Sequence, residues 1–466
     1  MLKYHLAIDI GASGGRHVLG YLHDGKLELE EIYCFQNGMI DKKGTCCWDV
    51  ERLFQEILTG MKLCNEAGKI PESVGIDAWG ADFVLLDKKN RIIGNVVGYG
   101  DHRTKGMDKK VATIVTEEEL YERTGTSRQV FNTLYQLMSI KENFPKQLLR
   151  AESMLMVPDY FHFLLTGNKI TEYTNATTTG LVNTKTKNWD YELIHKLGLP
   201  EKIFTQILKP GELLGKITKK VENRVGFNCS VILPATHNTG SAVLSVPAYR
   251  KNTLYLNSGT WTTLGVERSQ ADCSKESRLK NFTNEGGYDY SFRYLKNIMG
   301  LGMIQSVRHE YHNKFSYGEL YGFAEAEKDF PSRVDVNDAK FLAPESMIEA
   351  IQDFCKTTRQ IIPETVGEIA AVIFFSLAKC YRETVEELEE ITGSEYSFIH
   401  IVGGGSSTEY LNQLTAKATG KKVYAGPSEA AAIGNLTCQM LTSGKFDSIE
   451  EARSTIFQSF EIKEYV

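Results

Sequence analysis

The first eighty residues alternate between apolar patterns typical of strands and one typical of a helix. A continuous apolar run predicts a buried strand at residues 4–10, and a second predicted strand at 17–22 ends in Asp24-Gly25, a dipeptide typical of tight hairpins. Residues 26–34 continue this meander. Apolar residues then recur at helical spacing over 50–64. The N-terminal part is therefore expected to be a three-stranded meander followed by an amphipathic helix.

The second half of the chain repeats part of this pattern. Predicted strands at 254–257 and 261–266 flank a turn of small residues, as two strands flank residues 11–16 near the N-terminus. A long amphipathic helix is expected over 366–392, and a short buried strand at 398–402. Two halves that share a strand–loop–strand unit predict a duplicated α/β fold with a cleft between its domains.

The length of 466 residues is too great for one typical core and favours two domains. We place the boundary so that the domains cover residues 1–246 and 247–466. Between about 110 and 230 the pattern is mostly helix and loop. This stretch is expected to be an insertion in the first domain, or a lid on it.

Composition and charge exclude some classes of partner. A net charge of −6 and an isoelectric point near 6.0 give no general attraction for nucleic acid or for an anionic membrane. The nine cysteines lack CxxC spacing, which indicates neither a zinc site nor a disulfide framework. No apolar run approaches 18 residues, and no leader pattern precedes the first strand. We expect a cytoplasmic protein, monomeric or homodimeric, that binds a small polar molecule.

The loop of residues 11–16 is the first candidate for phosphate chemistry. Because it joins a strand to a strand, it fits neither a dinucleotide-binding fingerprint nor a Walker loop, which both need a helix directly after the glycines. Its backbone N–H groups can still cradle phosphate, while Asp9 can hold a hydrated Mg²⁺ beside it. An ordinary glycine-rich turn explains the pattern equally well.

Two groups of polar residues suggest sugar contacts. Asp77 and Asp82 flank Trp79 at the end of a predicted strand, a combination that suits sugar hydroxyls and a C–H face but that also occurs in structural roles. Asp101 and Arg103 would point the same way on an extended segment. That pair would suit a polyol, or it is a surface ion pair.

Two further segments are rich in small residues. Residues 235–242 enter a predicted helix whose first N–H groups could face an anion, unless a side chain such as Thr239 simply caps the helix. The glycines 403–405 follow a predicted strand and would let a flat ligand such as adenine approach the backbone. Ser406 and Glu409 form a capping-box pattern for the next helix.

Nine segments carry a resemblance that extends from Asp9 to Ser407: DIGASGGR, GIDAWGADFVLLD, FNTLYQL, VPDYFHFLLTG, EYTNATTTGLVN, LNSGTW, NEGG, LKNIMGL and HIVGGGSS. In this order they resemble the FGGY carbohydrate kinases, most of all those that phosphorylate the 1-hydroxyl of L-rhamnulose. The resemblance implies duplicated domains of the actin-like ATPase (ribonuclease H-like) fold with an interdomain cleft. It also implies ATP and Mg²⁺ as cofactors and a small ketose as substrate, with the first domain on the sugar side and the second on the nucleotide side.

The resemblance further implies roles for individual residues. Those expected to contact the nucleotide are Ala12, Ser13, Gly14, Gly15, Arg16, Thr260, Gln305, Gly403 and Gly404. Those expected to contact the ketose are Gly80, Asp82, His237, Asn238, Thr239 and Asn297. Asp9 would hold Mg²⁺ through water, while Arg16 and position 238 would take part in catalysis.

Asn238 departs from the family, which has an aspartate as general base between the histidine and the threonine. An amide cannot accept the hydroxyl proton at neutral pH, so the rate would fall by about 10²- to 10⁴-fold while binding need not suffer. Three explanations remain open: an engineered substitution, a natural member with low activity or a sugar-sensing role, or a kinase that uses another carboxylate such as Asp82. The alternative functions are a non-catalytic regulator that binds sugar and nucleotide, and a kinase for another ketose such as L-fuculose or D-xylulose.

Overall fold

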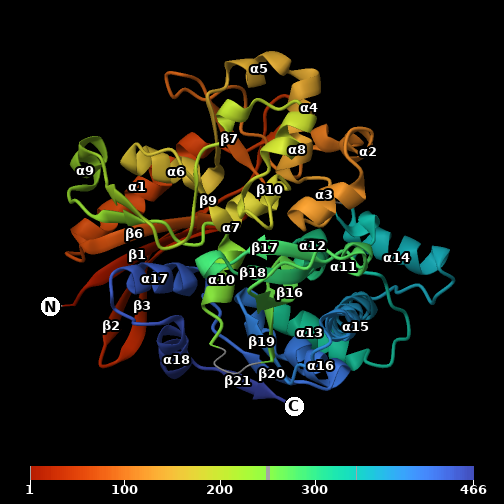
Figure 1. The fold of residues 1–466 in the computed structure, drawn as a ribbon. Helices are drawn as coiled ribbons and strands as arrows, with labels where there is room; N and C mark the ends of the chain where they lie inside the picture. Colours follow the sequence, from red (N-terminus) through yellow and green to blue (C-terminus); the bar gives the residue numbers. More distant parts are fainter. Residues whose placement is uncertain (1, 248–251, 343) are drawn as a thin grey trace. The chain divides into compact units, whose positions relative to one another are not determined.

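The structure is a computed structural model that describes residues 2–247, 252–342 and 344–466. The chain divides into two compact units (Figure 1). Unit 1 consists of Met1–Pro247, Glu267–Tyr294 and Ala430–Ser459, and unit 2 of Ala248–Val266, Leu295–Glu429 and Phe460–Val466. Two segments of unit 1 thus come from the second half of the sequence. The domain boundary after residue 246 stays a prediction.

Unit 1 contains a six-stranded sheet in the order β13-β14-β6-β1-β2-β3. Its strands are β1 (Tyr4–Ile10), β2 (Gly14–His23), β3 (Lys26–Gln36), β6 (Pro71–Ala78), β13 (Leu213–Lys216) and β14 (Ser230–Ile232). Strands β1 to β3 form the predicted antiparallel meander, and β6 and β14 extend it in parallel. Asp24 and Gly25 both have positive φ, as the tight hairpin between β2 and β3 requires.

Helices cover both faces of this sheet (Figure 1). Leu6 and Ile8 of β1 pack into one core cluster with Leu53 and Ile57 of α1 (Val50–Glu66). The alternate residue Ala7 packs instead against α17 (Ala430–Thr442). Burial on both faces explains why β1 is a continuous apolar run rather than an alternating one.

The stretch between β6 and β14 adds a second core cluster to unit 1. As predicted, it is mostly helix and loop: α2 (Met107–Ala112), α3 (Glu117–Thr124), α4 (Thr133–Asn143), α5 (Pro145–Arg150), α6 (Val157–Thr166), α7 (Tyr173–Ala176), α8 (Tyr191–Lys196) and α9 (Lys219–Val225). Paired short strands are β4 (Ile40–Asp41) with β5 (Cys46–Cys47), β7 (Phe83–Leu86) with β8 (Ser153–Met156), β9 (Thr171–Glu172) with β12 (Ile207–Leu208), and β10 (Val182–Asn183) with β11 (Asn188–Trp189). The remaining elements of unit 1 are α10 (Asn238–Leu244), α11 (Lys275–Leu279), β17 (Thr283–Gly286) and α18 (Ile449–Ser459).

Unit 2 is built on neighbouring strands in the order β18-β16-β15-β19-β20-β21. These are β15 (Thr253–Ser258), β16 (Trp261–Arg268), β18 (Phe292–Met299), β19 (Phe398–Val402), β20 (Lys422–Ala425) and β21 (Lys463–Tyr465). Its helices are α12 (Gly302–Glu310), α13 (Tyr317–Ala326), α14 (Met347–Thr357), α15 (Val366–Thr392) and α16 (Glu409–Thr419). The antiparallel pair β15–β16 beside parallel β19 repeats the arrangement of β1, β2 and β6, which confirms the predicted duplication.

Helix ends show where local patterns were misleading. The expected helix over 366–392 is present and ends at Gly393 with φ 62°. However, the capping box at Ser406 and Glu409 is wrong, because residues 404–407 form a 3₁₀ turn and α16 begins after Thr408 without a side-chain cap. Thr239 does not cap α10 either, since its hydroxyl is bound by Arg293.

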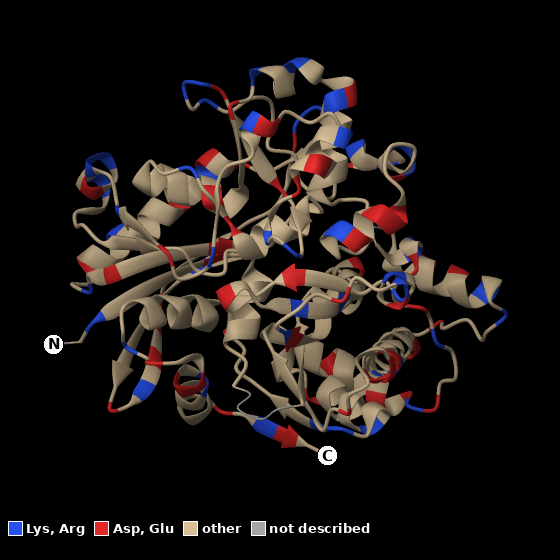
Figure 2. Cartoon of the chain, viewed as in Figure 1, with Lys and Arg blue, Asp and Glu red and all other residues tan. Residues whose placement is uncertain are grey.

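Basic and acidic side chains are interspersed along both units, as Figure 2 shows. Within the described ranges, no helix combines the length and the apolarity that a membrane crossing would need.

Candidate active site

The turn after β6 is held by hydrogen bonds from two distant segments of unit 1. The Ala81 N–H donates to Thr178 Oγ1 at 3.0 Å, and Thr133 Oγ1 donates to the Ala81 carbonyl at 2.6 Å. Gly80 leaves no room for a side chain: a Cβ there would lie 3.1 Å from Thr178 Cγ2 and 3.3 Å from His237 Nε2. Gly80 and His237, both predicted to contact the ketose, are therefore neighbours.

Hydrogen bonds fix the segment before α10 to the end of β6 and to Glu172. The Ala78 N–H donates to the Thr236 carbonyl at 2.9 Å. The buried carboxylate of Glu172 accepts from both the N–H and the hydroxyl of Thr236, each at 2.9 Å. Thr174 Oγ1 donates to Glu172 and accepts from the His237 N–H at 3.2 Å. Glu172 thereby positions the backbone that carries His237.

A buried ion pair contacts the side chains on either side of Asn238. Arg293 is fully buried, and its Nη2 donates to Glu285 Oε2 at 2.8 Å. Its Nη1 donates to Thr239 Oγ1 at 2.8 Å, and its Nε to the Gly286 carbonyl at 2.9 Å. Glu285 Oε2 also lies 3.3 Å from His237 Nδ1. Strands β17 and β18 thus supply two charges that hold His237 and Thr239.

Asn238 is the first residue of α10 and is partly exposed. The N-cap of this helix is His237, which makes no side-chain capping bond. Position 238 therefore lies between His237 and Thr239, and Arg293 contacts the side chains of both.

Asp82 is enclosed by donors and has no exposed surface. Its Oδ2 accepts hydrogen bonds from the indoles of Trp48 at 2.7 Å and Trp79 at 3.0 Å and from the Tyr99 N–H at 3.1 Å, and its Oδ1 from Gln136 at 3.0 Å. Burial raises the pKa of Asp82 to about 6 despite these donors. This geometry gives Asp82 a structural role, and its expected contact with the ketose stays a prediction.

Asp101 and Arg103 also bind protein groups. Asp101 accepts from the Cys46 N–H at 2.9 Å, while Arg103 donates to Gln136. Both side chains therefore have partners within the protein, and their contact with a polyol stays a prediction.

The predicted phosphate loop joins β1 to β2 as a tight turn. The Gly11 N–H donates to the Gly14 carbonyl at 2.8 Å, which leaves Ala12 and Ser13 exposed at the tip. Gly15 has a packing reason to lack a side chain, because a Cβ would lie 2.3 Å from the ring of Phe35. Arg16 lies opposite Asp9 in the β1–β2 register.

Asp9 and Asp77 are register partners on the parallel strands β1 and β6. Burial and the neighbouring Asp9 carboxylate raise the pKa of Asp77 well above its usual range, whereas Asn435 donates to Asp77 Oδ2 at 2.6 Å. Two carboxylates beside an exposed turn fit a divalent cation, which would relieve their repulsion. The described residues contain no cluster of three or more His, Cys, Asp or Glu side chains suited to a metal.

Unit 2 brings several predicted nucleotide contacts together. Thr260 Oγ1 donates to Gln305 Oε1 at 3.1 Å. Gly403 has φ 84°, and a Cβ there would lie 2.7 Å from Asn257 Oδ1, at the end of β15. Within unit 2, the turn after β15 thus adjoins Gln305, and the end of β15 adjoins the glycines after β19. Asn297 lies on β18 and is partly exposed.

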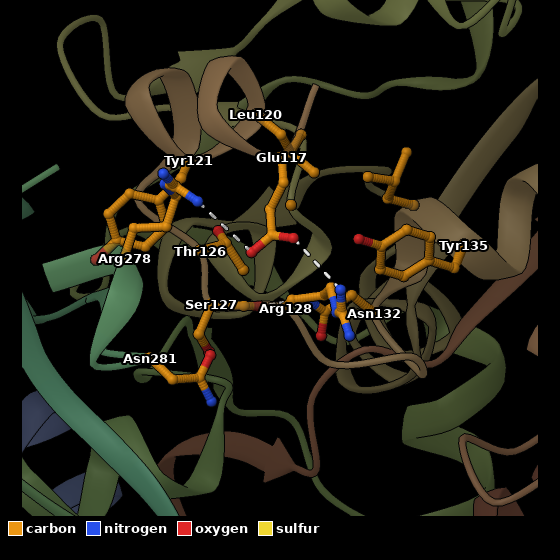
Figure 3. A pocket seen from close by; sticks show the side chains of 12 residues that line it. Glu117, Leu120, Tyr121, Thr126, Ser127, Arg128, Asn132, Tyr135, Arg278 and Asn281 are labelled. Atoms are coloured by element: carbon orange, nitrogen blue, oxygen red, sulfur yellow. Dashed lines mark hydrogen bonds and ion pairs between the residues drawn. The ribbon is translucent and has the colours of Figure 1, made fainter. Parts of the chain in front are cut away.

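Figure 3 shows a cavity of unit 1 that none of the predicted site residues lines. Glu117 crosses it, 3.3 Å from Arg128 and 3.9 Å from Arg278. Its volume of about 20 Å³ has room for one water molecule but not for a sugar.

The sequence of the chain matches the N-terminal domain of the FGGY family of carbohydrate kinases over residues 4–244 and the C-terminal domain of that family over residues 254–443. The chain belongs to the FGGY family of carbohydrate kinases. It is 49% identical over 465 residues to the rhamnulokinase of Halalkalibacterium halodurans, covering 100% of this chain and 99% of that protein. It is 39% identical to the rhamnulokinase of Bacillus subtilis, covering 98% and 94%.

Solved structures of more distant carbohydrate kinases share the fold. The gluconate kinase of Lactobacillus acidophilus superposes with a TM-score of 0.80 at 17% identity, covering 100% of this chain and 94% of that one. The glycerol kinase of Plasmodium falciparum with ADP gives 0.79 at 15% identity, covering 99% and 94%. The FGGY membership and the actin-like ATPase fold predicted from the sequence are thereby confirmed.

Three residues of the site escaped the sequence analysis: Glu172, Glu285 and Arg293. Glu285 lies in the NEGG segment that carried the family resemblance, but nothing local tied it to His237. The available signal was Arg293 itself, a charged residue in the apolar strand β18. A buried arginine requires partners, although the sequence does not say which.

Proposed function

We propose that this chain is an ATP-dependent kinase that transfers the γ-phosphoryl group to the 1-hydroxyl of L-rhamnulose. The observation that carries the proposal is the 49% identity with a rhamnulokinase over 100% of this chain. The match covers the whole chain, including the segments that hold the predicted sugar and nucleotide contacts, so the substrates are inferred to be shared as well.

On the sugar side, we assign ketose contacts to Gly80, His237, Thr239 and Asn297. The absence of a side chain at Gly80 leaves backbone close to His237, where hydroxyl groups would find donors and acceptors. Asn297 would add an amide from β18.

On the nucleotide side, the exposed Ala12 and Ser13 would present N–H groups to the phosphates, with Arg16 beside them. Thr260, Gln305 and the backbone at Gly403 and Gly404 would contact the rest of ATP. Asp9 would hold Mg²⁺ through water, and the bound ion would neutralise phosphate charge.

The amide of Asn238 can hydrogen-bond a sugar hydroxyl but cannot take its proton. Phosphoryl transfer depends mainly on positioning and electrostatics, so we expect measurable turnover. A full general base contributes about 10²- to 10⁴-fold. We therefore predict that Asn238→Asp raises kcat by up to this factor, measured as ketose-dependent ADP release.

A panel of ketoses tests the substrate. We expect kcat/KM for L-rhamnulose to exceed those for L-fuculose and D-xylulose by at least about tenfold, the effect of one well-placed hydrogen bond. A higher value for another ketose would assign the kinase to that sugar.

A regulator that binds sugar and nucleotide without turnover is the second candidate, and Asn238 is the observation that favours it. It predicts calorimetric binding of ATP·Mg²⁺ and L-rhamnulose to the unchanged protein, no ADP release at saturation, and turnover only after Asn238→Asp. Failure of either ligand to bind would contradict both candidates.

We also infer a cytoplasmic location, because all nine cysteines are free, as reducing compartments keep them. A monomer or homodimer remains the expected oligomeric state.

A further inference from the structure

Asn238 leaves the reaction without the carboxylate that the family places there, so another group near this position has to take the proton of the ketose hydroxyl. Asp82 is a poor substitute, because four donors already occupy its two oxygens. The neighbouring His237 is different: its side chain keeps 13% of its surface exposed, and its Nε2 adjoins Gly80.

We propose that His237, supported by Glu285, accepts the proton of the ketose hydroxyl in this chain. The inference rests on the proposed kinase function. It assigns His237 a catalytic role in addition to sugar contact, and Glu285 and Arg293 positioning roles.

Glu285 favours the tautomer that this role needs. Its Oε2 accepts from Arg293 Nη2 at 2.8 Å and lies 3.3 Å from His237 Nδ1, so a proton on Nδ1 would give this carboxylate a further donor. Arg293 Nη2 also lies 3.3 Å from Nδ1 and can only donate, so it would bind the ring only in the opposite tautomer, with Nδ1 unprotonated and the proton on Nε2.

Thr239 closes the same network. Its Oγ1 accepts from Arg293 Nη1 at 2.8 Å, which leaves the hydroxyl proton to be donated elsewhere. This oxygen lies 3.2 Å from each ring nitrogen of His237. With Nδ1 protonated toward Glu285, Nε2 is the nitrogen that can accept.

The charge state agrees with a base. Burial lowers the pKa of His237 below its usual value of 6.5, and the positive charge of Arg293 lowers it further. The carboxylate of Glu285 raises this pKa, but the lowering effects are larger. The ring is therefore neutral at pH 7. Glu285 and Arg293 are the charged groups that face the ring and shift its pKa.

Proton transfer to His237 accompanies phosphoryl transfer to the ketose. The O–H bond of the ketose breaks and an Nε2–H bond forms, while the hydroxyl oxygen bonds to the γ-phosphorus. The bond from that phosphorus to the β–γ bridging oxygen breaks, and its electron pair leaves with ADP. The imidazolium then returns its proton to water.

The test combines kinetics with histidine NMR. We expect His237→Gln to lower kcat by about 10²-fold while the calorimetric Kd for L-rhamnulose changes less than tenfold, because glutamine keeps a donor and an acceptor. The acid limb of the kcat–pH profile should lie below pH 6.5 in the unchanged protein. Glu285→Gln should move it to lower pH, because removing a negative charge lowers the pKa of His237 further.

A second substitution separates proton transfer from structural damage. In the double variant His237→Gln/Asn238→Asp, the introduced carboxylate should restore kcat to within about tenfold of Asn238→Asp alone. A folding defect would not be rescued in this way. ¹⁵N spectra of histidine-labelled protein should show His237 protonated at Nδ1 and not at Nε2.

An unchanged kcat in His237→Gln, or an Nε2–H tautomer, would overturn this inference while leaving the kinase function intact. Absence of ketose phosphate from the unchanged protein, with turnover only after Asn238→Asp, would instead overturn the proposed function and this inference with it.

Discussion

Arg293 carries its charge into a part of unit 1 where water does not reach it. Its guanidinium donates hydrogen bonds to Gly286, Thr239 and Glu285 and lies 3.3 Å from His237 Nδ1. A buried charge is tolerated only when it is paired and fully bonded, so each partner depends on the other. At the scale of the residue, the site is therefore an electrostatic network. Removing one charged side chain leaves its partner buried and unpaired, which lowers the stability of the protein.

Replacing this arginine measures that dependence. We expect Arg293→Met to lower the free energy of unfolding by about 3–5 kcal/mol, because Glu285 is left buried and unpaired. Arg128→Met is the matched control: its side chain is 53% exposed in an ion pair with Glu117, and the loss should stay below about 1 kcal/mol. Urea unfolding of both variants provides the comparison, and equal losses would contradict the assigned role.

At the scale of the element, local sequence patterns predict many of the strands and helices. The buried strand β1, the Asp24-Gly25 hairpin and the helix α15 agree with the sequence because apolar periodicity and turn chemistry act over a few residues. Thr239 was a possible cap, but it lies inside α10, after the N-cap His237, and its hydroxyl is bound by Arg293, 54 residues away. Contacts of that range leave no periodic signal.

Because long-range contacts leave no local signal, only part of the site could be predicted from the sequence. Gly80, His237 and Thr239 came from a motif resemblance, and the structure brings them together in unit 1. Glu285 could not be joined to them, because 48 residues, which include α10, β15, β16 and α11, separate it from His237 in the sequence.

The crossing of α10 and α17 gives a prediction at this scale. A Cβ on Gly434 would lie 1.7 Å from the Ser241 carbonyl oxygen, so the two helices meet backbone to backbone. We expect Gly434→Ala to destabilise the protein by about 3 kcal/mol, since the helices would have to separate. In Gly322→Ala the same change occurs in α13 with nothing within 4 Å, and should stabilise by about 0.5–1 kcal/mol.

Scanning calorimetry distinguishes these two glycines. The Gly434→Ala variant should melt several degrees below the unchanged protein and the Gly322→Ala variant slightly above it. A Gly434→Ala variant of unchanged stability would show that α10 is not held by this close approach, and the placement of His237 at its start would lose its support.

At the scale of the whole molecule, each unit carries one part of the proposed chemistry. Unit 1 holds Gly80, His237 and Thr239, which we propose to contact the ketose, together with Asp9 and the exposed turn after β1, and unit 2 holds Asn297, Thr260, Gln305 and the glycines after β19. The duplication explains why both units place small residues at the end of a central strand, where backbone N–H groups can meet an anion.

Direct detection of the product tests this account. The unchanged protein is incubated with ATP, Mg²⁺ and L-rhamnulose, and the reaction is followed by ³¹P and ¹³C NMR. We expect ADP and a phosphate monoester coupled to the C1 methylene to appear in equal amounts. ADP without the ester, an ester at another carbon, or no reaction while both ligands bind would contradict it.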